Sequence, residues 1–320
     1  MTTLFCSRHP LERAENLHAV WDAYTGPKVF KQGIEFCYLA DDMHCNVLVY
    51  DEIPTFRTHR AQCKGIFIGH GIPGIKSYGL DEPSHFIDDR VCDQIDFAIA
   101  PSEQSREILA RQLGISIDKV LPLGFPRTDA YFNNSGGKTI MSKYRRAYFY
   151  APTFRYDWDA APLPRINWKK LDKLLEKDEV FVVKRHYFTE EPLVQVITDK
   201  VLEVPYSEPS TEYLVDCDVL VTDFSSMLFD GYILNKPSII AIDCLDQYKL
   251  NRGVYLDYPY NHGSRLLELE NNEEAFINML RDAFDKGMQQ QDLACKEWAC
   301  AACDGHSSAR VAELIAKYDR

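Results

Sequence analysis

The segment VLVTDFSSMLFD, residues 219–230, changes from the pattern of a buried strand to that of a helix within a few residues. Apolar and β-branched residues fill its first part, and an apolar helix begins after an acid, a phenylalanine and two serines. A strand that runs directly into a helix is typical of βαβ units, whose strands form a parallel sheet. The polar residues Asp223, Ser225 and Ser226 are therefore expected at the carboxyl end of a parallel strand.

Three explanations fit polar residues at such a position: a helix cap, a hydrolase nucleophile or a phosphate cradle. A cap accounts for only one of Asp223, Ser225 and Ser226. A nucleophilic serine in this setting normally has a glycine two residues away on each side, and these glycines are missing. Free N–H groups at a helix start, together with two hydroxyls, form an anion site. The segment therefore predicts a phosphate cradle, in which Asp223 orients the loop or holds a ligand hydroxyl.

The same alternation of apolar strands and amphipathic helices continues along the chain in two series. Strands are predicted at 3–7, 46–51, 65–70, 97–101 and 120–124, and then at 147–152, 180–186, 201–205, 219–223 and 238–243. A helix is predicted over 102–114, with Ser102 as its cap and Gly114 at its end. The polar, glycine-containing segment 132–146 separates the two series. The prediction is an α/β protein with two Rossmann-like, doubly wound domains, at 1–137 and 138–300, and a C-terminal helix at 301–320 that packs back on the first domain.

Composition limits the class of function. The 320 residues carry 36 Lys and Arg against 48 Asp and Glu, a net charge of -12, which argues against a nucleic-acid-binding surface. No apolar run approaches the roughly 20 residues that span a bilayer, and charged residues such as Arg8 and Glu12 interrupt the start. A cytoplasmic protein is expected. The Cys-x-x-Cys at 300–303 lacks a matching second pair, so neither a metal site nor a tightly bound cofactor is predicted.

Ligands of doubly wound sheets bind beyond the carboxyl ends of the strands, where several cation-capable residues are predicted. His70 stands between two glycines after one strand, and histidine is the usual proton-transfer residue near neutral pH. Lys184 and His186 share one side of another strand end, and Arg155 follows a third. The alternatives are a structural histidine, a solvated strand end and a surface arginine. An anion site near a catalytic histidine is the favoured interpretation.

Five strings in this order resemble one known family: HGIP at 70–73, FPRTD at 125–129, APTFR at 151–155, KRH at 184–186, and DFSSMLFD at 223–230 with later Lys-Pro and Arg-Gly pairs. Together, over residues 65–260, they are similar to the CDP-glycerol glycerophosphotransferase family, whose members prime and polymerise teichoic acids and related capsule polymers. The chain departs from the family pattern at Ile72, Tyr187 and Ser210. The resemblance implies a GT-B-type fold, with a cleft between two facing domains.

The resemblance also implies a reaction, in which an acceptor hydroxyl attacks the polyol-bearing phosphorus of CDP-glycerol or CDP-ribitol and CMP leaves. The acceptor is a saccharide, a lipid-linked molecule or a polymer, and a lipid-linked acceptor implies work at the inner face of the cytoplasmic membrane. His70 is the expected base, and His186 is expected to assist the leaving phosphate. The expected donor and phosphate ligands are Thr153, Arg155, Lys184, Ser225, Ser226 and Arg252, and the expected supporting residues are Gly71, Arg127, Asp223 and Asp230.

Two other functions stay open from the sequence. A GT-B glycosyltransferase that uses a nucleotide sugar needs the same diphosphate cradle, so the fold alone does not separate it from a polyol-phosphate transferase. A non-catalytic nucleotide-binding subunit of a polymer-assembly complex is the other alternative. The presence of both His70 and His186 favours an enzyme.

Overall fold

The computed structural model describes most of the chain: residues 2–33, 45–53, 63–83, 94–133, 136, 138–153, 166–184, 186, 198–205, 207–242, 245–255, 257–268 and 272–319. The chain divides into two compact units. The first unit comprises Met1–Asn133 and Glu297–Arg320, and the second comprises Asn134–Lys296. The chain thus leaves the first unit a few residues before the expected boundary at 137/138 and re-enters it a few residues before 301.

The first unit is built on a parallel six-stranded sheet. Its order is β2-β1-β3-β4-β5-β6, so the strand order reverses beside β1, as in doubly wound sheets. The strands are β1 (Thr2–Ser7), β2 (Lys28–Gln32), β3 (Cys45–Tyr50), β4 (Lys64–Phe67), β5 (Phe97–Ile99) and β6 (Val120–Leu121). The sequence did not predict β2, because this edge strand is only half-buried and carries polar residues in place of an apolar run.

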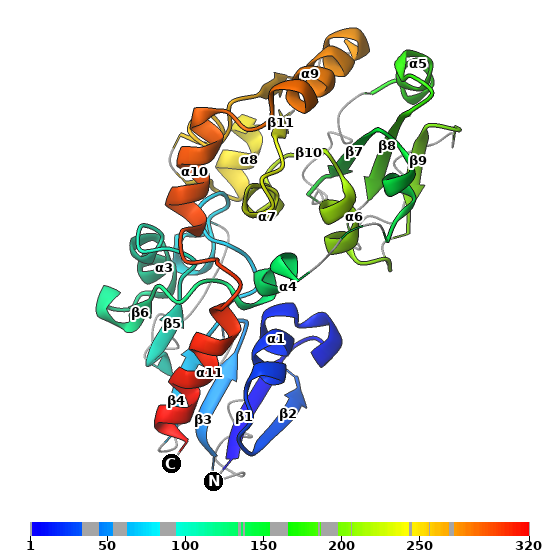
Figure 1. The fold of residues 1–320 in the computed structure, drawn as a ribbon. Coiled ribbons are helices and arrows are strands. Elements are labelled where there is room, and N and C mark those ends of the chain that lie inside the picture. The colour runs from blue at the N-terminus through cyan, green and yellow to red at the C-terminus, as the bar shows by residue number, and fades with distance from the viewer. Residues whose placement is uncertain are drawn as a thin grey trace. The chain divides into compact units, whose positions relative to one another are not determined.

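Helices cover both faces of this sheet, because alternate strand residues point to opposite sides. Phe5, Val49 and Ile66 face α1 (Glu15–Ala23) and α11 (Ser307–Tyr318), which lie side by side (Figure 1). Leu4, Tyr50 and Phe67 pack on the other side with α3 (Arg106–Leu113). Short elements complete the unit: η1 (Leu11–Arg13), η2 (Gly79–Asp81), η4 (Ile117–Lys119), η5 (Pro126–Thr128) and α4 (Asp129–Phe132).

The boundaries of α3 correct one prediction. The helix begins at Arg106, and Ser102 does not cap it. Instead, Ser102 and Ser105 form a turn before the helix, in which the Ser105 N–H donates to Ser102 Oγ at 3.0 Å. The predicted end is confirmed, because Gly114 follows the last turn with a φ of 61°, a conformation that favours glycine.

The second unit repeats the architecture with the order β12-β11-β10-β7-β8-β9. Its strands are β7 (Arg146–Ala151), β8 (Glu179–Lys184), β9 (Val201–Val204), β10 (Val219–Thr222), β11 (Ser238–Ile242) and β12 (Leu266–Glu268). The sequence did not predict β12, a three-residue strand at the edge. The helices are η6 (Ile140–Lys143), α5 (Trp168–Leu174), α6 (Ser210–Asp216), α7 (Met227–Ile233), α8 (Leu245–Asn251) and α9 (Glu273–Lys286). Helix α10 (Gln290–Cys300) begins in this unit, and its last residues belong to the first.

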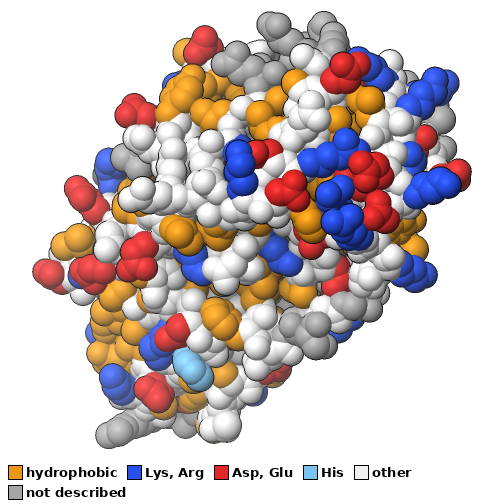
Figure 2. Space-filling view, turned by 45° about the horizontal axis from the view of Figure 1, so that its top comes forward, with side chains coloured by type: hydrophobic (Ala, Val, Ile, Leu, Met, Phe, Trp, Pro, Cys, Tyr) orange, Lys and Arg blue, Asp and Glu red, His pale blue; other side chains and the backbone are white. Residues whose placement is uncertain are grey.

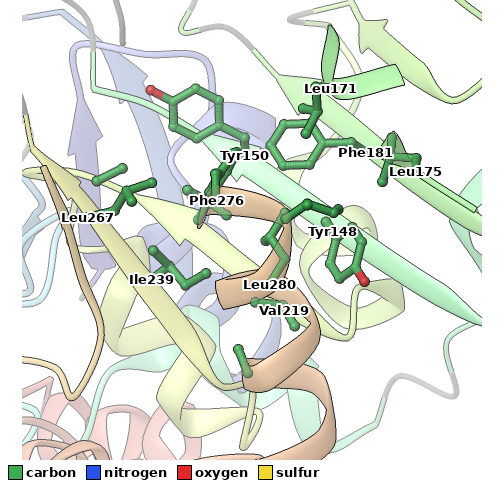
Figure 3. Close-up of a cluster of buried hydrophobic side chains, with 14 of the residues drawn as sticks. Tyr148, Tyr150, Leu171, Leu175, Phe181, Val219, Ile239, Leu267, Phe276 and Leu280 are labelled. Carbon is green, nitrogen blue, oxygen red and sulfur yellow. The ribbon is translucent and has the colours of Figure 1, made fainter. Parts of the chain in front are cut away.

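The core of the second unit fixes its sheet in place. Phe276 and Leu280 of α9 pack on strand residues such as Tyr150, Phe181 and Ile239 (Figure 3). These strand residues are fully buried, as expected of a parallel sheet covered on both faces. The carboxyl ends of the central strands are thereby held in a fixed register.

One face of the surface and the lengths of the helices bear on charge and hydropathy. On the face drawn in Figure 2, the described side chains mix basic and acidic groups and form no continuous basic surface. Within the described ranges, no helix combines the length and the apolar character that a membrane crossing requires.

Candidate active site

The strand order of the second unit gathers three polar loops at one edge of its sheet. Strands β10, β7 and β8 are neighbours, and their registers pair Thr222 with Ala151 and Tyr150 with Val183. If the same registers continue past the strand ends, residue 153 lies opposite residue 224 on one side and opposite residue 186 on the other. Neighbouring strands are about 4.8 Å apart, so the described residues at these strand ends, among them Thr153, His186 and Ser225, form a polar rim at this edge.

Contacts of Asp223 and Phe224 fix the turn after β10. Asp223 is fully buried, and its Oδ1 accepts the backbone N–H of Thr153 at 2.8 Å. The Tyr258 hydroxyl donates to the Asp223 carbonyl. Phe224 lies parallel to the ring of Tyr248, with centroids 3.7 Å apart. Asp223 thus joins the turn after β10 to the residues that follow β7, and its side chain is fully buried.

The two serines of this turn differ in their bonding. Ser225 Oγ accepts the Met227 N–H at 3.3 Å. Ser226 is half-buried, and its hydroxyl has no hydrogen-bond partner among the described residues. Within the same part of the chain, the backbone N–H groups of Ser225 and Ser226 are also uncommitted. Two amides and one hydroxyl are therefore available to an anion.

The hydrogen bonds at the start of α7 limit which groups can serve the expected anion site. The N–H groups of Leu228 and Phe229 already donate to the carbonyls of Ser225 and Ser226, at 3.2 and 3.0 Å. Helix α7 has only seven residues, so its aligned peptide dipoles are few. The N–H groups of the first helical turn are used in bonds to Ser225 and Ser226, so the available N–H groups are those of the turn before the helix.

Lys184 and Thr153 are more buried than the sequence suggested. Lys184 is 7% exposed, and its Nζ donates to the Pro205 carbonyl at 3.4 Å. Desolvation lowers the pKa of Lys184, and the charge of Glu208 opposes this effect. Thr153 is 4% exposed, whereas His186 is half-buried. Arg155 lies outside the described residues.

Arg252 and Asp230 follow the residues of this turn along the chain. Tyr248 stacks on Phe224, and Arg252 follows it by four residues, about one helical turn, at the end of α8. The side chain of Arg252 is half-buried. Asp230 lies inside α7 and is 2% exposed, so its place is one of support beneath the turn.

The first unit places His70 at the carboxyl end of β4. The chain turns at Gly69, whose φ of 63° lies in the left-handed region that favours glycine. Asn16 of α1 donates to the Gly69 carbonyl at 2.8 Å and accepts the Arg127 N–H at 2.9 Å. Tyr78 meets the His70 ring edge-on, with centroids 5.6 Å apart and an interplanar angle of 83°. The imidazole is exposed, and the turn at Gly69 and the ring of Tyr78 restrict its position.

The protonation of His70 reflects these surroundings. The protein around the exposed ring desolvates it, which lowers the pKa of His70. The charge of Glu52 and a hydrogen bond to the backbone of Asp51 oppose this shift, whereas Lys76 and Arg127 add to it. A lowered pKa keeps the imidazole neutral at neutral pH, which is the form that accepts a proton.

Two residues of the FPRTD string have structural contacts. The side chain of Arg127 is 11% exposed; its Nη1 donates to Tyr131 Oη at 3.1 Å, and its Nε is 3.8 Å from Glu15. Asp129 accepts the N–H groups of Ser307 and Ser308, at 3.0 and 2.7 Å, and so caps α11. The side chain of Arg127 is therefore mostly buried, and its backbone N–H is linked through Asn16 to the loop that carries the exposed His70 and the half-buried Gly71.

Several residues beside the strand ends of each unit were missed from the sequence. Asn16 is buried on an amphipathic helix, where a polar residue on the apolar face was the available signal. Nothing in the sequence marks Tyr248 and Tyr258 as partners of the turn after β10. Among the residues that the structure describes, no group of three or more His, Cys, Asp or Glu is placed to hold a metal ion.

A family comparison adds to this geometry. The sequence model of the CDP-glycerol:poly(glycerophosphate) glycerophosphotransferase family matches residues 36–317, which is most of the chain. The chain belongs to this family. The resemblance read from the five strings is thereby confirmed.

Curated relatives come from teichoic acid synthesis. The chain is 28% identical to the teichoic acid glycerol-phosphate primase of Bacillus subtilis over 216 residues, covering 62% of this chain and 55% of the primase. It is 25% identical to the teichoic acid ribitol-phosphate primase of Bacillus spizizenii over 318 residues, covering 88% of this chain and 78% of that protein. The chain thus spans little more than half the length of the first of these glycerophosphotransferase relatives.

A solved structure agrees with the fold. The wall teichoic acid polymerase TagF matches with a TM-score of 0.74 and 19% identity, over 98% of this chain and 88% of that one. At this identity the likeness concerns the fold alone. It confirms the predicted α/β class with two Rossmann-like domains.

Proposed function

We propose that the chain transfers a polyol phosphate, most simply glycerol phosphate, from a CDP-activated donor to a hydroxyl of a saccharide, lipid-linked or polymer acceptor, with release of CMP. The observation that carries the proposal is the turn after β10 in a chain of this family. It offers the Ser226 hydroxyl and the N–H groups of Ser225 and Ser226, all uncommitted within the described ranges. Such donors suit the oxygens of a diphosphate.

The donor phosphates would be held by the rim of the second unit. Ser225 and Ser226 would donate to the diphosphate, and Thr153, Arg155, Lys184 and Arg252 would complete its ligands. Asp223 and Asp230 would keep the turn in shape, since both are buried. Phosphoryl transfer depends mainly on positioning and charge stabilisation, so a rigid turn of this kind supports the reaction.

His70 would act as the base. The acceptor oxygen would form a bond to the polyol-bearing phosphorus as its proton passes to the neutral imidazole. The bond between that phosphorus and the bridging oxygen would break, and CMP would leave with the electron pair. His186 would donate a hydrogen bond or a proton to the leaving phosphate, and Gly71 and Arg127 would support the loop of His70.

The donor polyol and the acceptor are finer assignments of the same proposal. Relatives named as glycerol-phosphate and ribitol-phosphate primases make CDP-glycerol and CDP-ribitol the two donors to compare. A lipid-linked acceptor would place the enzyme at the inner face of the cytoplasmic membrane. The basic segment 143–146 contributes little to such contact, because Arg145 pairs with Asp178 and Arg146 pairs with the buried Glu179.

Nucleotide release by the purified protein tests the proposal. CDP-glycerol, CDP-ribitol, a UDP-sugar and a GDP-sugar are supplied in turn, with and without acceptor isolated from cells. The wild type is compared with His70→Ala and with His18→Ala, a matched control that removes a half-exposed histidine of α1. Loss of the base should lower the rate by about 10²–10⁴, and the control should keep wild-type activity.

Each outcome has a meaning. Nucleotide released only from a CDP-polyol, and lost in His70→Ala, supports polyol-phosphate transfer. Release of UDP or GDP makes the protein a nucleotide-sugar glycosyltransferase. Tight binding of CDP without turnover of any donor supports a non-catalytic subunit.

A further inference from the structure

The turn after β3 contacts both His70 and its neighbour Tyr78. Asp51 directly follows β3, and its backbone forms a hydrogen bond with the His70 side chain. The backbone of Ile53, two residues on, bonds to the hydroxyl of Tyr78, whose ring meets His70 edge-on. One turn thus fixes both the imidazole and the aromatic ring beside it. Between these two anchoring residues lies Glu52.

Glu52 is held in place from the end of β1. Arg8 Nε lies 2.9 Å from Glu52 Oε2, and His9 Nε2 lies 3.6 Å from Oε1. Ser7 Oγ donates to Asp51 Oδ2 at 3.0 Å and accepts the His9 N–H at 3.1 Å. The Glu52 side chain is only 15% exposed. These contacts give its carboxylate a fixed position beside the turn.

Strand register brings Glu52 to the level of the His70 loop. The pairs Cys6–Tyr50 and Tyr50–Phe67 align β1, β3 and β4. Two residues further on, positions 8, 52 and 69 are level, directly before His70. Arg8, which pairs with Glu52, directly follows β1 and precedes the segment 36–317 that matches the family.

We propose that Glu52, clamped by Arg8, is a positioning residue for His70. The inference rests on the proposed role of His70 as the base. The bond to the Asp51 backbone engages one ring nitrogen and leaves the other to accept the proton of the acceptor. The Glu52 carboxylate then stabilises the imidazolium that forms, as a carboxylate does for the histidine of other acid–base pairs.

The charges around the imidazole decide in which direction a change at Glu52 moves the pKa of His70. Glu52 favours the imidazolium, whereas Lys76 and Arg127 disfavour it. Asp51 and Glu52 also raise the pKa of Tyr78, whose ring contacts His70, and Arg8 opposes them. Glu52→Gln removes a favourable negative charge, so it lowers the pKa of His70. A weaker base should slow turnover at neutral pH, and the acidic limb of the pH–rate profile should move to lower pH.

Histidine NMR measures this coupling without using activity. The imidazole signals of isotope-labelled full-length protein are titrated with pH, and the His70 signal is assigned by its loss in His70→Ala. Glu52→Gln should move the His70 midpoint to lower pH, and Glu52→Asp, which keeps the charge, should move it less. Glu103→Gln is the matched control, because Glu103 also pairs with an arginine, Arg106, but at the start of α3. Its His70 midpoint should equal that of the wild type.

Kinetics then show whether the coupling matters for transfer. With CDP-glycerol and acceptor, Glu52→Gln should lower kcat about tenfold, less than loss of the base itself, with the donor KM unchanged. An unchanged His70 midpoint in Glu52→Gln, or the same shift in Glu103→Gln, overturns the inference. Full activity of His70→Ala would instead overturn the proposed base, and the NMR titration would still report on the coupling.

Discussion

Ser226→Ala is a selective probe of the phosphate cradle. The Ser226 hydroxyl is half-buried and has no hydrogen-bond partner in the described part of the chain, so its removal should leave the free energy of unfolding unchanged. If the hydroxyl donates to a donor phosphate, its loss removes a hydrogen bond to a charged group. Such a bond contributes about 1.5–3 kcal/mol. The dissociation constant for CDP should therefore rise by roughly 10- to 150-fold.

Ser225→Ala is the matched comparison, because the two serines are adjacent and differ in their bonding. Ser225 Oγ accepts the Met227 N–H at 3.3 Å, a long bond near the start of α7. Its loss should lower the free energy of unfolding by about 0.5–1 kcal/mol. The two variants should thus separate ligand binding from stability, with Ser226→Ala affecting chiefly the first.

Calorimetric titration with CDP and urea unfolding of the unliganded proteins measure both quantities. Wild-type CDP affinity in Ser226→Ala would refute the placement of the diphosphate on this turn. A large loss of stability in the same variant would show that the hydroxyl has a structural role, contrary to its uncommitted state.

Three further changes test the supports of the site and the fold. Asp223→Ala leaves the Thr153 N–H without its buried acceptor and should lower the free energy of unfolding by about 1–3 kcal/mol, measured by urea unfolding, with weaker CDP binding; unchanged values for both would contradict this. Burial alone would raise the pKa of Glu179, but hydrogen bonds, chiefly from Arg281, lower it to about 2 from 4.5. Its stabilisation, about 3 kcal/mol, is present above about pH 4.5 and is lost as the pH falls towards 2, so Glu179→Gln should unfold more readily at pH 7 and differ least from wild type near pH 2. Burial raises the pKa of Asp51 from 3.8 to about 7, so wild-type stability should fall as the pH rises between these values. Asp51→Asn should remove that decline and be more stable above pH 7 by up to about 4 kcal/mol, and thermal unfolding over a pH series checks this; a decline that persists would place its cause elsewhere.

The central strands could be predicted because they are buried on both faces. Segments such as 147–152 and 219–223 are continuous apolar runs, and the structure has β7 and β10 there to within a residue or two. The edge strands β2 and β12 were missed for the opposite reason. β2 is half-exposed and carries Lys and Gln, and β12 has only three residues, so neither leaves a periodic signal.

The strand ends could be predicted, but their bonding could not. The sequence placed Asp223 and the two serines at the end of a parallel strand, because a strand pattern turns into a helix pattern there. It could not show that Asp223 is buried and bonded to Thr153, 70 residues away, since that contact depends on the register of β7 and β10. The ion pair between Arg8 and Glu52 could not be predicted from the sequence either. These two residues meet only because β1 pairs with β3.

The identity of the nucleotide released from CDP-glycerol tests the central claim most directly. The purified protein is incubated with CDP-glycerol and acceptor, and the nucleotide product is identified by chromatography and mass. Transfer of glycerol phosphate breaks the bond between the two phosphates and releases CMP, with a new phosphodiester on the acceptor. The account predicts CMP, in equal amount to the phosphodiester. Release of CDP would mean that the bond to the glycerol carbon breaks instead, and would contradict phosphoryl transfer.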